Sequence, residues 1–519
     1  MLTRLGLLDY EDFGTRLIVE DESAGREEAD ETSTGARHVL LSKPAQTILL
    51  VLVFSSLPFF VPRLGKYREM LPRVSALASF KGSEAAPASD IPGGAPVGSD
   101  STYASTAAPE TLVVGSDHRI EDPAKTLDPF YAALAQTEAR RPGAITRITH
   151  YGDSPITNDG ITGTVRRLLQ TRFGDAGHGF ILVDRPWAWY GHDAITFTSG
   201  GGWTDEPILN AKVNDGQFGL GGVTFRANGP GKYARFAPAS QGETGKSFSR
   251  MEVYYLQQPG GGQLSISVND EGAQTVSTGG DTVRSGFYEA KAPRVGPNTF
   301  QVTTVGADEV RLFGAVLEND GPGVVYDSLG VNGAYAGMLA TAMNEEHWKQ
   351  QLQHRRPDLV VINYGTNESQ YATPAQMERY ERELREVIRR VREALPTASI
   401  LILSPMDRGQ HAPGGRIITK PTIPMIVEMQ RRVALDTGCA FFNTFSAMGG
   451  EGTMAKWYAG TGRKHLVNTD LTHPTAQGAE IVGRLIYEAL YDGYTKYRAR
   501  TAGGEPPLVA QQTVVTGDK

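Results

Sequence analysis

The sequence predicts an α/β fold in which helices flank a parallel sheet, with an inserted β-sandwich and an N-terminal transmembrane anchor. Three observations predict it. Apolar runs typical of buried parallel strands alternate with amphipathic helix patterns in two parts of the chain. Between these parts, short alternating strands separated by Gly- and Pro-containing turns fill residues 205–320. Near the N-terminus, an uncharged apolar run of about 17 residues reaches the lower limit for crossing a bilayer.

Composition sets the broad class of the protein. A chain of 519 residues predicts two or three folding units, at roughly 150 residues per domain. With 40% hydrophobic and 21% charged residues, most of the chain is expected to fold in water. The net charge of −7 argues against nucleic acid as a partner, because phosphate binding needs clustered Lys and Arg. The single cysteine, Cys439, excludes an internal disulfide and a cysteine-based zinc site, and its apolar neighbours favour a buried thiol.

The N-terminal region is interpreted as a tail, an anchor and a spacer. Residues 1–44 are acidic and lack apolar periodicity, which predicts a disordered tail. Residues 45–62 (AQTILLVLVFSSLPFFVP) are the predicted single transmembrane span, with a cleaved signal or a buried core helix as the alternatives. Residues 63–110 are a predicted linker, because their later part is rich in Ala, Pro, Ser and Gly. Lys and Arg are more frequent after the span than before it, so the positive-inside rule favours a cytoplasmic C-terminal part.

The elements of the α/β part are marked by their apolar spacing. Helical spacing is strongest at 374–395 and is also present at 128–139. Buried parallel strands are predicted at 145–152 (ITRITHYG), 358–365 (DLVVINYG), 399–406 (SILILSPM) and 439–445 (CAFFNTF).

The β-rich segment has a different sequence pattern. Its strands alternate apolar and polar residues and are separated by turns such as PGGG, STGG and RVGPN. The predicted sandwich resembles small carbohydrate-binding modules in architecture, and a purely structural role is the alternative. Its clearest strands are SRMEVYYLQQ, QLSISVND, NTFQVTTV and EVRLFGAVLE.

Ser154 stands between a predicted strand and a helix pattern, in the run Gly152-Asp153-Ser154-Pro155. A serine at the carboxyl end of a parallel strand lies where open α/β sheets build their sites. Pro155 suits a first helical position and leaves Ser154 at the predicted N-cap, facing the positive end of the helix. The alternative is a capping serine without chemistry.

Asp470 and His473 supply what a reactive serine needs. A serine hydroxyl is a poor nucleophile unless a base removes its proton, and the base needs a third group to hold its tautomer. The two residues are three positions apart in LVNTDLTHPTAQG, at the entrance to a terminal amphipathic helix. The carboxylate can then accept from the imidazole Nδ1 while Nε2 points outward. The alternative is helix capping by Asp470 or Thr472 beside an incidental histidine.

Two further turns offer donors for a developing oxyanion. Asn367 follows the strand at 358–365 and is expected at the same sheet edge as Ser154. Gly333 lies in a tight loop within VVYDSLGVNGA, although Gly330 stands three residues earlier. In the order Ser, Gly, Asn, then Asp and His, the blocks resemble the SGNH (GDSL-type) hydrolase family.

The resemblance implies a fold and a set of roles. It implies a flavodoxin-like parallel sheet and hydrolysis without a metal or organic cofactor. Ser154 would be the nucleophile and His473 the base, oriented by Asp470. The N–H groups of Ser154 and Gly333, with the Asn367 side chain, would bind the oxyanion. The proline after Ser154 departs from the leucine or histidine often found there, which puts in doubt any polar role for that position.

Further segments narrow the resemblance to a branch of the family. Residues 173–184, 310–334 and 446–458, together with the β-rich insert, look like bacterial peptidoglycan O-acetylesterases. This implies a serine esterase that removes O-acetyl groups from a cell-wall or extracellular polysaccharide such as peptidoglycan, through an acyl-serine intermediate. The alternatives are a polysaccharide O-acetyltransferase with the same triad and a catalytically silent glycan-binding scaffold.

The expected location follows from that activity. The catalytic part would face the periplasm or cell exterior, held by one span in the bacterial inner membrane, against the charge distribution around that span. The oligomeric state stays open. The predicted units are the tail 1–44, the anchor 45–62, the linker 63–110, the SGNH domain in two parts at 111–204 and 321–498, the carbohydrate-binding-module-like insert 205–320, and a disordered tail at 499–519.

Several other residues have two interpretations. His178, in a Gly-rich turn, is interpreted as a surface histidine, with a place in the cleft as the alternative. Two interpretations are open for the aromatic residues Trp187, Trp189 and Tyr190: they stack on sugar rings, or they pack into the core or against the insert. Asp153, Glu368, Asp470 and His473 lack a compact metal-ligand spacing, so no metal site is predicted.

Overall fold

The computed structural model describes residues 119–209, 213, 215–294, 296–371, 373–460 and 464–502. The predicted N-terminal tail, anchor and linker, and most of the C-terminal tail, lie outside the described residues. Within the described part, no helix is both long enough and apolar enough to cross a membrane.

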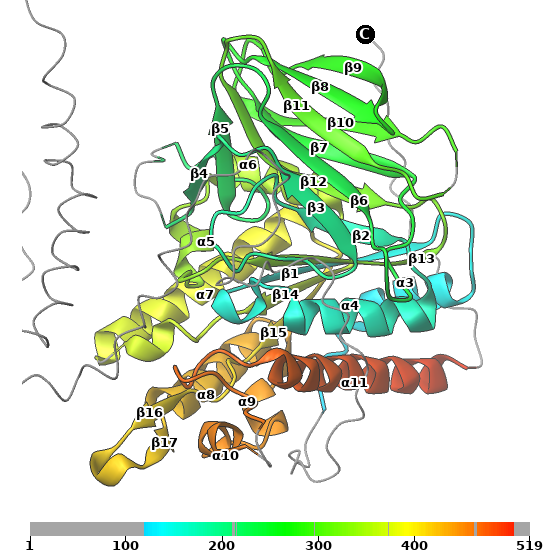
Figure 1. The fold of residues 1–519 in the computed structure, drawn as a ribbon. Coiled ribbons are helices and arrows are strands. Elements are labelled where there is room, and N and C mark those ends of the chain that lie inside the picture. The colour runs from blue at the N-terminus through cyan, green and yellow to red at the C-terminus, as the bar shows by residue number, and fades with distance from the viewer. Residues whose placement is uncertain are drawn as a thin grey trace, which may run out of the picture. The chain divides into compact units, whose positions relative to one another are not determined.

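A five-stranded parallel sheet forms the centre of the α/β part (Figure 1). Counted along the chain within this sheet, the strands lie in the order 2-1-3-4-5, which is the flavodoxin-like order. The predicted α/β fold with a parallel sheet and flanking helices is therefore confirmed. The order reverses between β1 (Ile145–Gly152) and β14 (Leu359–Asn363), where open α/β sheets place their ligands. From edge to edge the strands are β13 (Gly323–Gly330), β1 (Ile145–Gly152), β14 (Leu359–Asn363), β15 (Ser399–Leu403) and β18 (Ala440–Phe442).

Helices cover both faces of this sheet because the buried strands alternate their side chains between two cores. Val360 and Ile362 of β14 join one core cluster, whereas Leu359 and Val361 join the other. One face is covered by α3 (Asp128–Glu138), α4 (Gly160–Phe173) and α11 (Ala476–Thr501), and the opposite face by α6 (Glu345–Arg355), α7 (Pro374–Ala394) and α8 (Thr422–Asp436). Short helices at α5 (Gly337–Thr341), α9 (Thr444–Ala447) and α10 (Thr453–Ala459) and a two-stranded ribbon of β16 (Gly409–His411) and β17 (Ile417–Thr419) complete this part.

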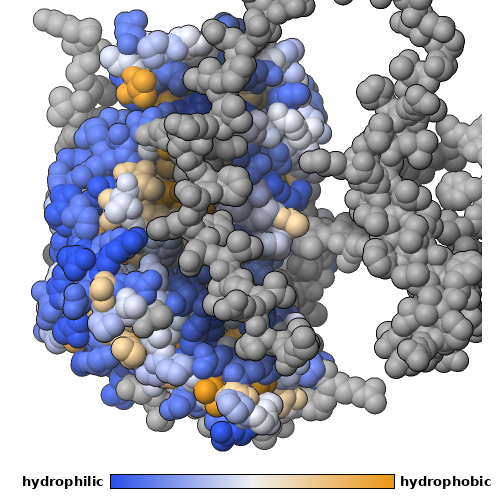
Figure 2. Space-filling view, turned by 90° about the vertical axis from the view of Figure 1, so that its left-hand side faces the viewer, coloured by the Kyte–Doolittle hydropathy of each residue, from blue (hydrophilic) through white to orange (hydrophobic). Residues whose placement is uncertain are grey.

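The longest predicted helix of the α/β part shows how local sequence sets the boundaries. Thr373 and Gln376 form a capping box at the start of α7, and Pro374 takes the first helical position. Buried residues then recur three or four positions apart, while the other face carries Arg and Glu residues. The face of the molecule on which α7 lies is mostly hydrophilic, with small separated apolar patches (Figure 2). The helix was predicted at 374–395 and ends at Ala394.

Two antiparallel sheets follow in the β-rich part, above the parallel sheet in Figure 1. Their inward side chains share one core cluster, which is continuous with the core beneath α6 and α7. The four predicted strands are confirmed as β7, β8, β11 and β12. The sheets contain β10 (Arg284–Lys291), β7 (Arg250–Gln257), β12 (Val310–Glu318), β5 (Val223–Ala227), β4 (Thr204–Pro207) and β2 (Gly177–Ile181) in one, and β3 (Ile195–Ser199), β6 (Tyr233–Pro238), β11 (Phe300–Val305), β8 (Gln263–Val268) and β9 (Glu271–Ser277) in the other.

The β-rich sheets begin before the predicted boundary at residue 205. The strand β2 pairs with β12, and β3 pairs with β6, although both precede that residue. The sequence could not indicate this, because the pairing partners lie far along the chain. In the same way, α11 continues to Thr501, into the predicted C-terminal tail. Whether 205–320 is an independent domain stays a prediction.

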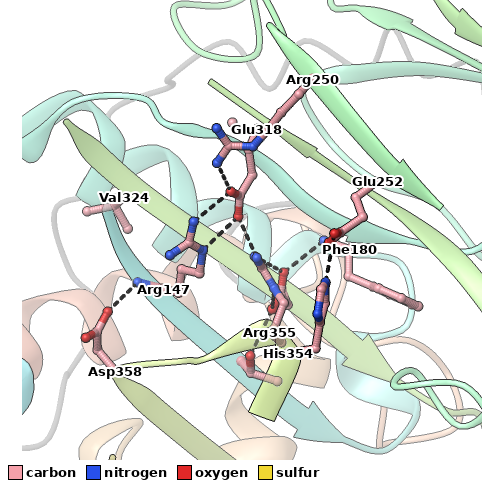
Figure 3. Close-up of polar contacts among 12 residues, drawn as sticks. Arg147, Phe180, Arg250, Glu252, Glu318, Val324, His354, Arg355 and Asp358 are labelled. Atoms are coloured by element: carbon pink, nitrogen blue, oxygen red, sulfur yellow. Dashed lines mark hydrogen bonds and ion pairs between the residues drawn. The ribbon is translucent and has the colours of Figure 1, made fainter. Parts of the chain in front are cut away.

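A buried cluster of charges joins the two parts (Figure 3). Glu318 of β12 accepts hydrogen bonds from Arg147 of β1, Arg250 of β7 and Arg355 at the end of α6. Arg355 also makes a two-pronged contact with Asp327 of β13, at 2.8 Å for both bonds. Burial by itself raises the pKa of Glu318, but the surrounding arginines outweigh it and hold that pKa well below its usual value. The cluster is therefore a charged joint between the parallel and antiparallel sheets.

Candidate active site

Ser154 lies at the carboxyl end of the central strand β1. The end of β1 lies close to the neighbouring strand because Gly152 has no side chain: an added Cβ would lie 2.9 Å from the Asn363 carbonyl oxygen. Ser154 opens a short 3-10 turn that ends at Ile156, and α4 begins only at Gly160. The predicted N-cap position for Ser154 is therefore wrong, because Asp153 precedes the turn and Asp159 precedes the helix. This leaves the Ser154 hydroxyl available for another partner.

That partner is His473, although 319 positions of sequence separate the two residues. The His473 Nε2 lies 2.7 Å from the Ser154 Oγ. On the other side of the ring, Nδ1 lies 2.6 Å from the Asp470 Oδ2. The structure thus brings together the three residues that the sequence analysis grouped as nucleophile, base and orienting acid.

The hydrogen-bond chain assigns the imidazole tautomer. An ionised carboxylate only accepts, so His473 donates its Nδ1–H to Asp470 and its Nε2 accepts the Ser154 O–H. Burial raises the pKa of Asp470, but hydrogen bonds from the His473 side chain and from the backbone N–H groups of His473 and Thr472 outweigh it and lower that pKa. The carboxylate therefore stays ionised beside the ring, as a base-orienting group requires.

The loop from Val467 to Pro474 holds the base in place. The Asn468 N–H donates to the His473 carbonyl, and the Leu471 N–H donates back to Asn468. Leu471 is buried and adopts a left-handed backbone with φ of 56°, which is unfavourable for a side-chain-bearing residue. Such backbone conformations persist where the surrounding contacts fix them. Here the Gly409 N–H donates to the Leu471 carbonyl at 2.8 Å.

The two other predicted donors lie on loops that are tied to each other. The Asn367 Nδ2 donates to the Ala334 carbonyl at 2.7 Å, which leaves its second amide hydrogen for another acceptor. Gly333, next to Ala334, has a φ of 78°, a conformation that suits glycine. The Thr366 N–H donates to the carboxyl of Asp153 at 3.2 Å, so the Asn367 loop is also tied to the residue before the nucleophile.

Two carboxyl groups lie buried behind this site. Burial raises the pKa of Asp153 to about 7, against hydrogen bonds from Thr366 and the charge of Arg408. Burial, and then the Asp153 charge, raise the pKa of Glu368 to about 8. Glu368 accepts the Ala336 N–H at 2.7 Å as well as the Gly365 N–H at 3.0 Å. Glu368 therefore holds the Gly333 and Asn367 loops together.

Arg408 connects the Asn367 loop to the loop that carries the base. Its Nη1 donates to the Thr366 carbonyl at 2.7 Å and to the Ser369 hydroxyl at 2.8 Å. Its Nε donates to the Thr472 hydroxyl at 3.2 Å. The sequence analysis missed this residue, because nothing in its neighbourhood indicates that a guanidinium links two distant loops. The predicted strand at 399–406 just before it was the only available signal.

A pocket of about 340 Å³ opens over the Ser154 and His473 side chains. Its walls come from the turn after β1, the loop after β13, the loop before α11 and the 187–190 turn. The pocket is lined by Ser154, Pro155, Thr157, Asn158, Trp189, Asn332, Asn468, Asp470, His473 and Pro474. A small acyl group bound there would lie against an activated hydroxyl.

His178 is not a surface histidine. It is buried on β2, and its Nε2 lies 2.9 Å from the His192 Nδ1. Among the described residues, Asp159, His178 and His192 are the one group close enough to share a metal ion. Arg166 binds both carboxylate oxygens of Asp159. Its guanidinium therefore supplies a positive charge beside this carboxylate. The group is best explained as a buried hydrogen-bond network that the sequence spacing of 14 between the histidines did not reveal.

Comparison with known proteins points to one family. Residues 298–481 match the model of the GDSL-like lipase/acylhydrolase family. This part of the chain is similar to that family. The match includes Gly333, Asn367, Asp470 and His473, whereas Ser154 lies before it, beyond the β-rich segment. The structure supplies the missing connection, because it places Ser154 against His473.

A solved structure shares this fold. The chain is similar to a peptidoglycan O-acetylesterase, with 22% identity and a TM-score of 0.61 over 73% of this chain and 99% of that one. It also matches family two carbohydrate esterases from Corynascus thermopiles (12% identity, TM-score 0.27, 56% of this chain and 99% of that one) and Cellvibrio japonicus (10%, 0.26, 61% and 98%). Comparison with curated proteins finds no match. At these identities, the first similarity shows a shared fold, and the other two are too distant to carry an argument.

Proposed function

We propose that this GDSL-type protein is a serine esterase that removes O-acetyl groups from a cell-wall or extracellular polysaccharide such as peptidoglycan. The observation that carries the proposal is the continuous hydrogen-bond chain from Ser154 through His473 to Asp470 at the floor of an open pocket. A serine in that arrangement is an activated nucleophile for acyl transfer.

The proposed reaction has two halves. In the first, the Ser154 oxygen attacks the ester carbonyl while its proton passes to the His473 Nε2. The tetrahedral intermediate collapses, and His473 gives the proton to the departing sugar oxygen, which leaves acetyl-Ser154. In the second half, His473 takes a proton from water, the hydroxyl attacks the acetyl carbonyl, and acetate leaves as Ser154 regains its proton.

The oxyanion of each tetrahedral intermediate needs donors. We assign this role to the N–H groups of Ser154 and Gly333 and to the free amide hydrogen of Asn367. The support is that the Asn367 and Gly333 loops are fixed to each other by the Asn367 and Glu368 side chains. Donors held in advance cost no reorganisation when charge develops, and one such donor contributes about 10²-fold or more to kcat.

Two observations support the acetyl and polysaccharide parts of the proposal. The peptidoglycan O-acetylesterase shares the fold, and a pocket of about 340 Å³ suits a small acyl group on a sugar. A transferase that uses the same triad differs only in its acceptor. Incubation with an acyl donor and an unacetylated glycan, followed by mass spectrometry, separates the two: a hydrolase releases acetate, whereas a transferase yields acetylated sugar.

We also propose that residues 45–62 hold the protein in a bacterial inner membrane as a single span, with the catalytic part in the periplasm or outside the cell. The support is the uncharged run AQTILLVLVFSSLPFFVP, followed by a long polar linker before the folded part. Fractionation with carbonate extraction tests the anchor, and protease added to intact spheroplasts tests the orientation. Resistance to protease in spheroplasts, with digestion after lysis, would place the catalytic part in the cytoplasm.

The central experiment measures acetate release from O-acetylated peptidoglycan and from 4-nitrophenyl acetate. Ser154→Ala and His473→Ala are each expected to reduce kcat by several orders of magnitude. Ser265→Ala, at a half-buried serine on β8 that does not line the pocket, is the matched control. Near wild-type turnover by the Ser154 variant would remove this residue from the mechanism.

A further inference from the structure

Trp189 stands out among the apolar side chains that the structure describes. Five of the large apolar side chains in the described part of the chain are exposed, and Trp189 is the only aromatic one among these five, with 51% of its surface accessible. It also lines the pocket that contains Ser154 and His473. An indole held in water costs free energy unless a ligand covers it, so its place in the lining of the pocket that contains Ser154 and His473 points to a binding role.

Hydrogen bonds and buried ring contacts hold the turn that carries Trp189. The Tyr190 N–H donates to the Trp187 carbonyl at 3.0 Å, which closes a turn with Trp189 at its third position. The Tyr190 ring is buried against Trp187, and its hydroxyl accepts the Leu182 N–H and lies 2.8 Å from the His192 Nε2. The buried histidine network therefore anchors this turn, and Trp189 projects from a rigid base.

The other walls of the pocket determine what the indole would cover. Three carboxamides line it, from Asn158, Asn332 and Asn468. The Asn158 Oδ1 accepts the Gly160 N–H at 3.1 Å and the Asn468 Nδ2 donates to the Pro474 carbonyl at 3.5 Å, so Asn158 still offers its NH₂ group and Asn468 its oxygen to hydroxyl and acetamido groups. Among the described residues, no Lys or Arg lines the pocket, and the one carboxylate in that described lining, Asp470, is already bound to His473. The described walls thus offer no countercharge for an anionic sugar such as a uronic acid.

We propose that Trp189 and the three asparagines form a subsite for one neutral pyranose ring, which stacks on the indole and presents its acetyl ester to Ser154. The apolar C–H face of a pyranose matches an aromatic face, while its hydroxyl edge needs the carboxamides. Trp187 and Tyr190 do not touch the ring and act as supports of the turn. This inference rests on the proposed esterase function, and it assigns the sugar-binding interpretation to Trp189 alone among the three aromatic residues.

The kinetic test compares a glycan with a small ester in the full-length protein. Trp189→Ala is expected to reduce kcat/KM on O-acetylated peptidoglycan at least tenfold more than on 4-nitrophenyl acetate, mainly through KM. Trp189→Phe keeps an aromatic face and is expected to recover part of the loss. Val283→Ala, at an exposed apolar residue that does not line the pocket, is the control. Equal effects of Trp189→Ala on both substrates, or no effect on either, would overturn the subsite.

A binding test separates the subsite from the esterase function. Ser154→Ala protein is titrated calorimetrically with chitotriose, a neutral N-acetylglucosamine trimer, and with trigalacturonate. Binding of chitotriose that is at least tenfold weaker after Trp189→Ala supports the subsite, even if the wild type hydrolyses no ester and the esterase proposal fails. Equally tight binding of trigalacturonate, or chitotriose binding that does not depend on Trp189, would overturn the subsite. Neither result would contradict the proposed esterase activity.

Discussion

Asp470→Asn tests the role of the orienting carboxylate with little disturbance of the loop. The Oδ1 of Asp470 accepts the N–H groups of Thr472 and His473, both at 3.0 Å, and an Asn side-chain oxygen can keep these two bonds. The Oδ2 position, which accepts the His473 Nδ1–H, becomes an NH₂ group. That group donates to Nδ1, moves the ring proton to Nε2, and removes the acceptor for the Ser154 hydroxyl.

The expected loss has two sources. The charge-assisted hydrogen bond to the imidazolium that forms in the transition state contributes about 1.5–3 kcal/mol. Recovery of the reactive tautomer costs about 1 kcal/mol more, the value of one ordinary hydrogen bond. Because 48% of the Asp470 side chain is exposed, water replaces part of the lost charge, and we use the middle of the first range, about 2 kcal/mol. The total of about 3 kcal/mol corresponds to a loss in kcat of roughly 10²-fold.

The assay is steady-state hydrolysis of 4-nitrophenyl acetate, together with a thermal melt of the same samples. Asp470→Asn should lower kcat with little change in KM, and its melting temperature should stay close to that of the wild type. Asp470→Ala removes both loop-capping bonds as well and should lower the melting temperature. A kcat for Asp470→Asn within tenfold of the wild type would refute the assignment of Asp470 as the orienting acid.

Two further predictions concern stability. The pKa of Glu368 is about 8 in the folded protein and about 4 in the unfolded chain. Between these two pH values, the native state keeps a proton that the unfolded chain releases. The contribution of Glu368 to stability therefore falls as pH rises. Glu368→Gln should therefore flatten the dependence of melting temperature on pH between 5 and 8, and profiles parallel to the wild type would contradict this. Arg355→Met removes a positive charge that pairs with the buried carboxylates of Glu318 and Asp327, and it should lower the free energy of unfolding in urea by about 3–5 kcal/mol. A loss below 1 kcal/mol would mean that the remaining arginines neutralise these carboxylates by themselves.

The sequence indicated individual strands well where their pattern was local. The predicted strand at 145–152 matches β1, and the helix at 374–395 is shorter by one residue. These elements are set by apolar periodicity and by caps within a few residues. The helix pattern that follows Ser154 is confirmed by α4, which begins at Gly160, but the Pro after Ser154 lies in a 3-10 turn and not at the start of the helix itself.

Local sequence patterns could not predict contacts between residues that lie far apart in the chain. His178 looked like a surface turn residue and is buried, because its strand pairs with β12 more than 130 positions later. Arg408 and Glu368 each tie two loops together, yet a single charged residue near a strand end has no signature of such a role. The interpretation of Trp189 stayed open until its exposure and its place in the pocket were known.

The sequence by itself determined the chemical types and their order: a serine after a strand, an asparagine after another, and an acid and a histidine three positions apart. Only the tertiary structure decided that the Ser154 and His473 side chains meet, across 319 positions and on either side of the β-rich segment. The physical reason is that the carboxyl ends of parallel strands converge at one sheet edge whatever the length of chain between them. Distances of closest approach depend on packing between elements, which a local pattern does not contain.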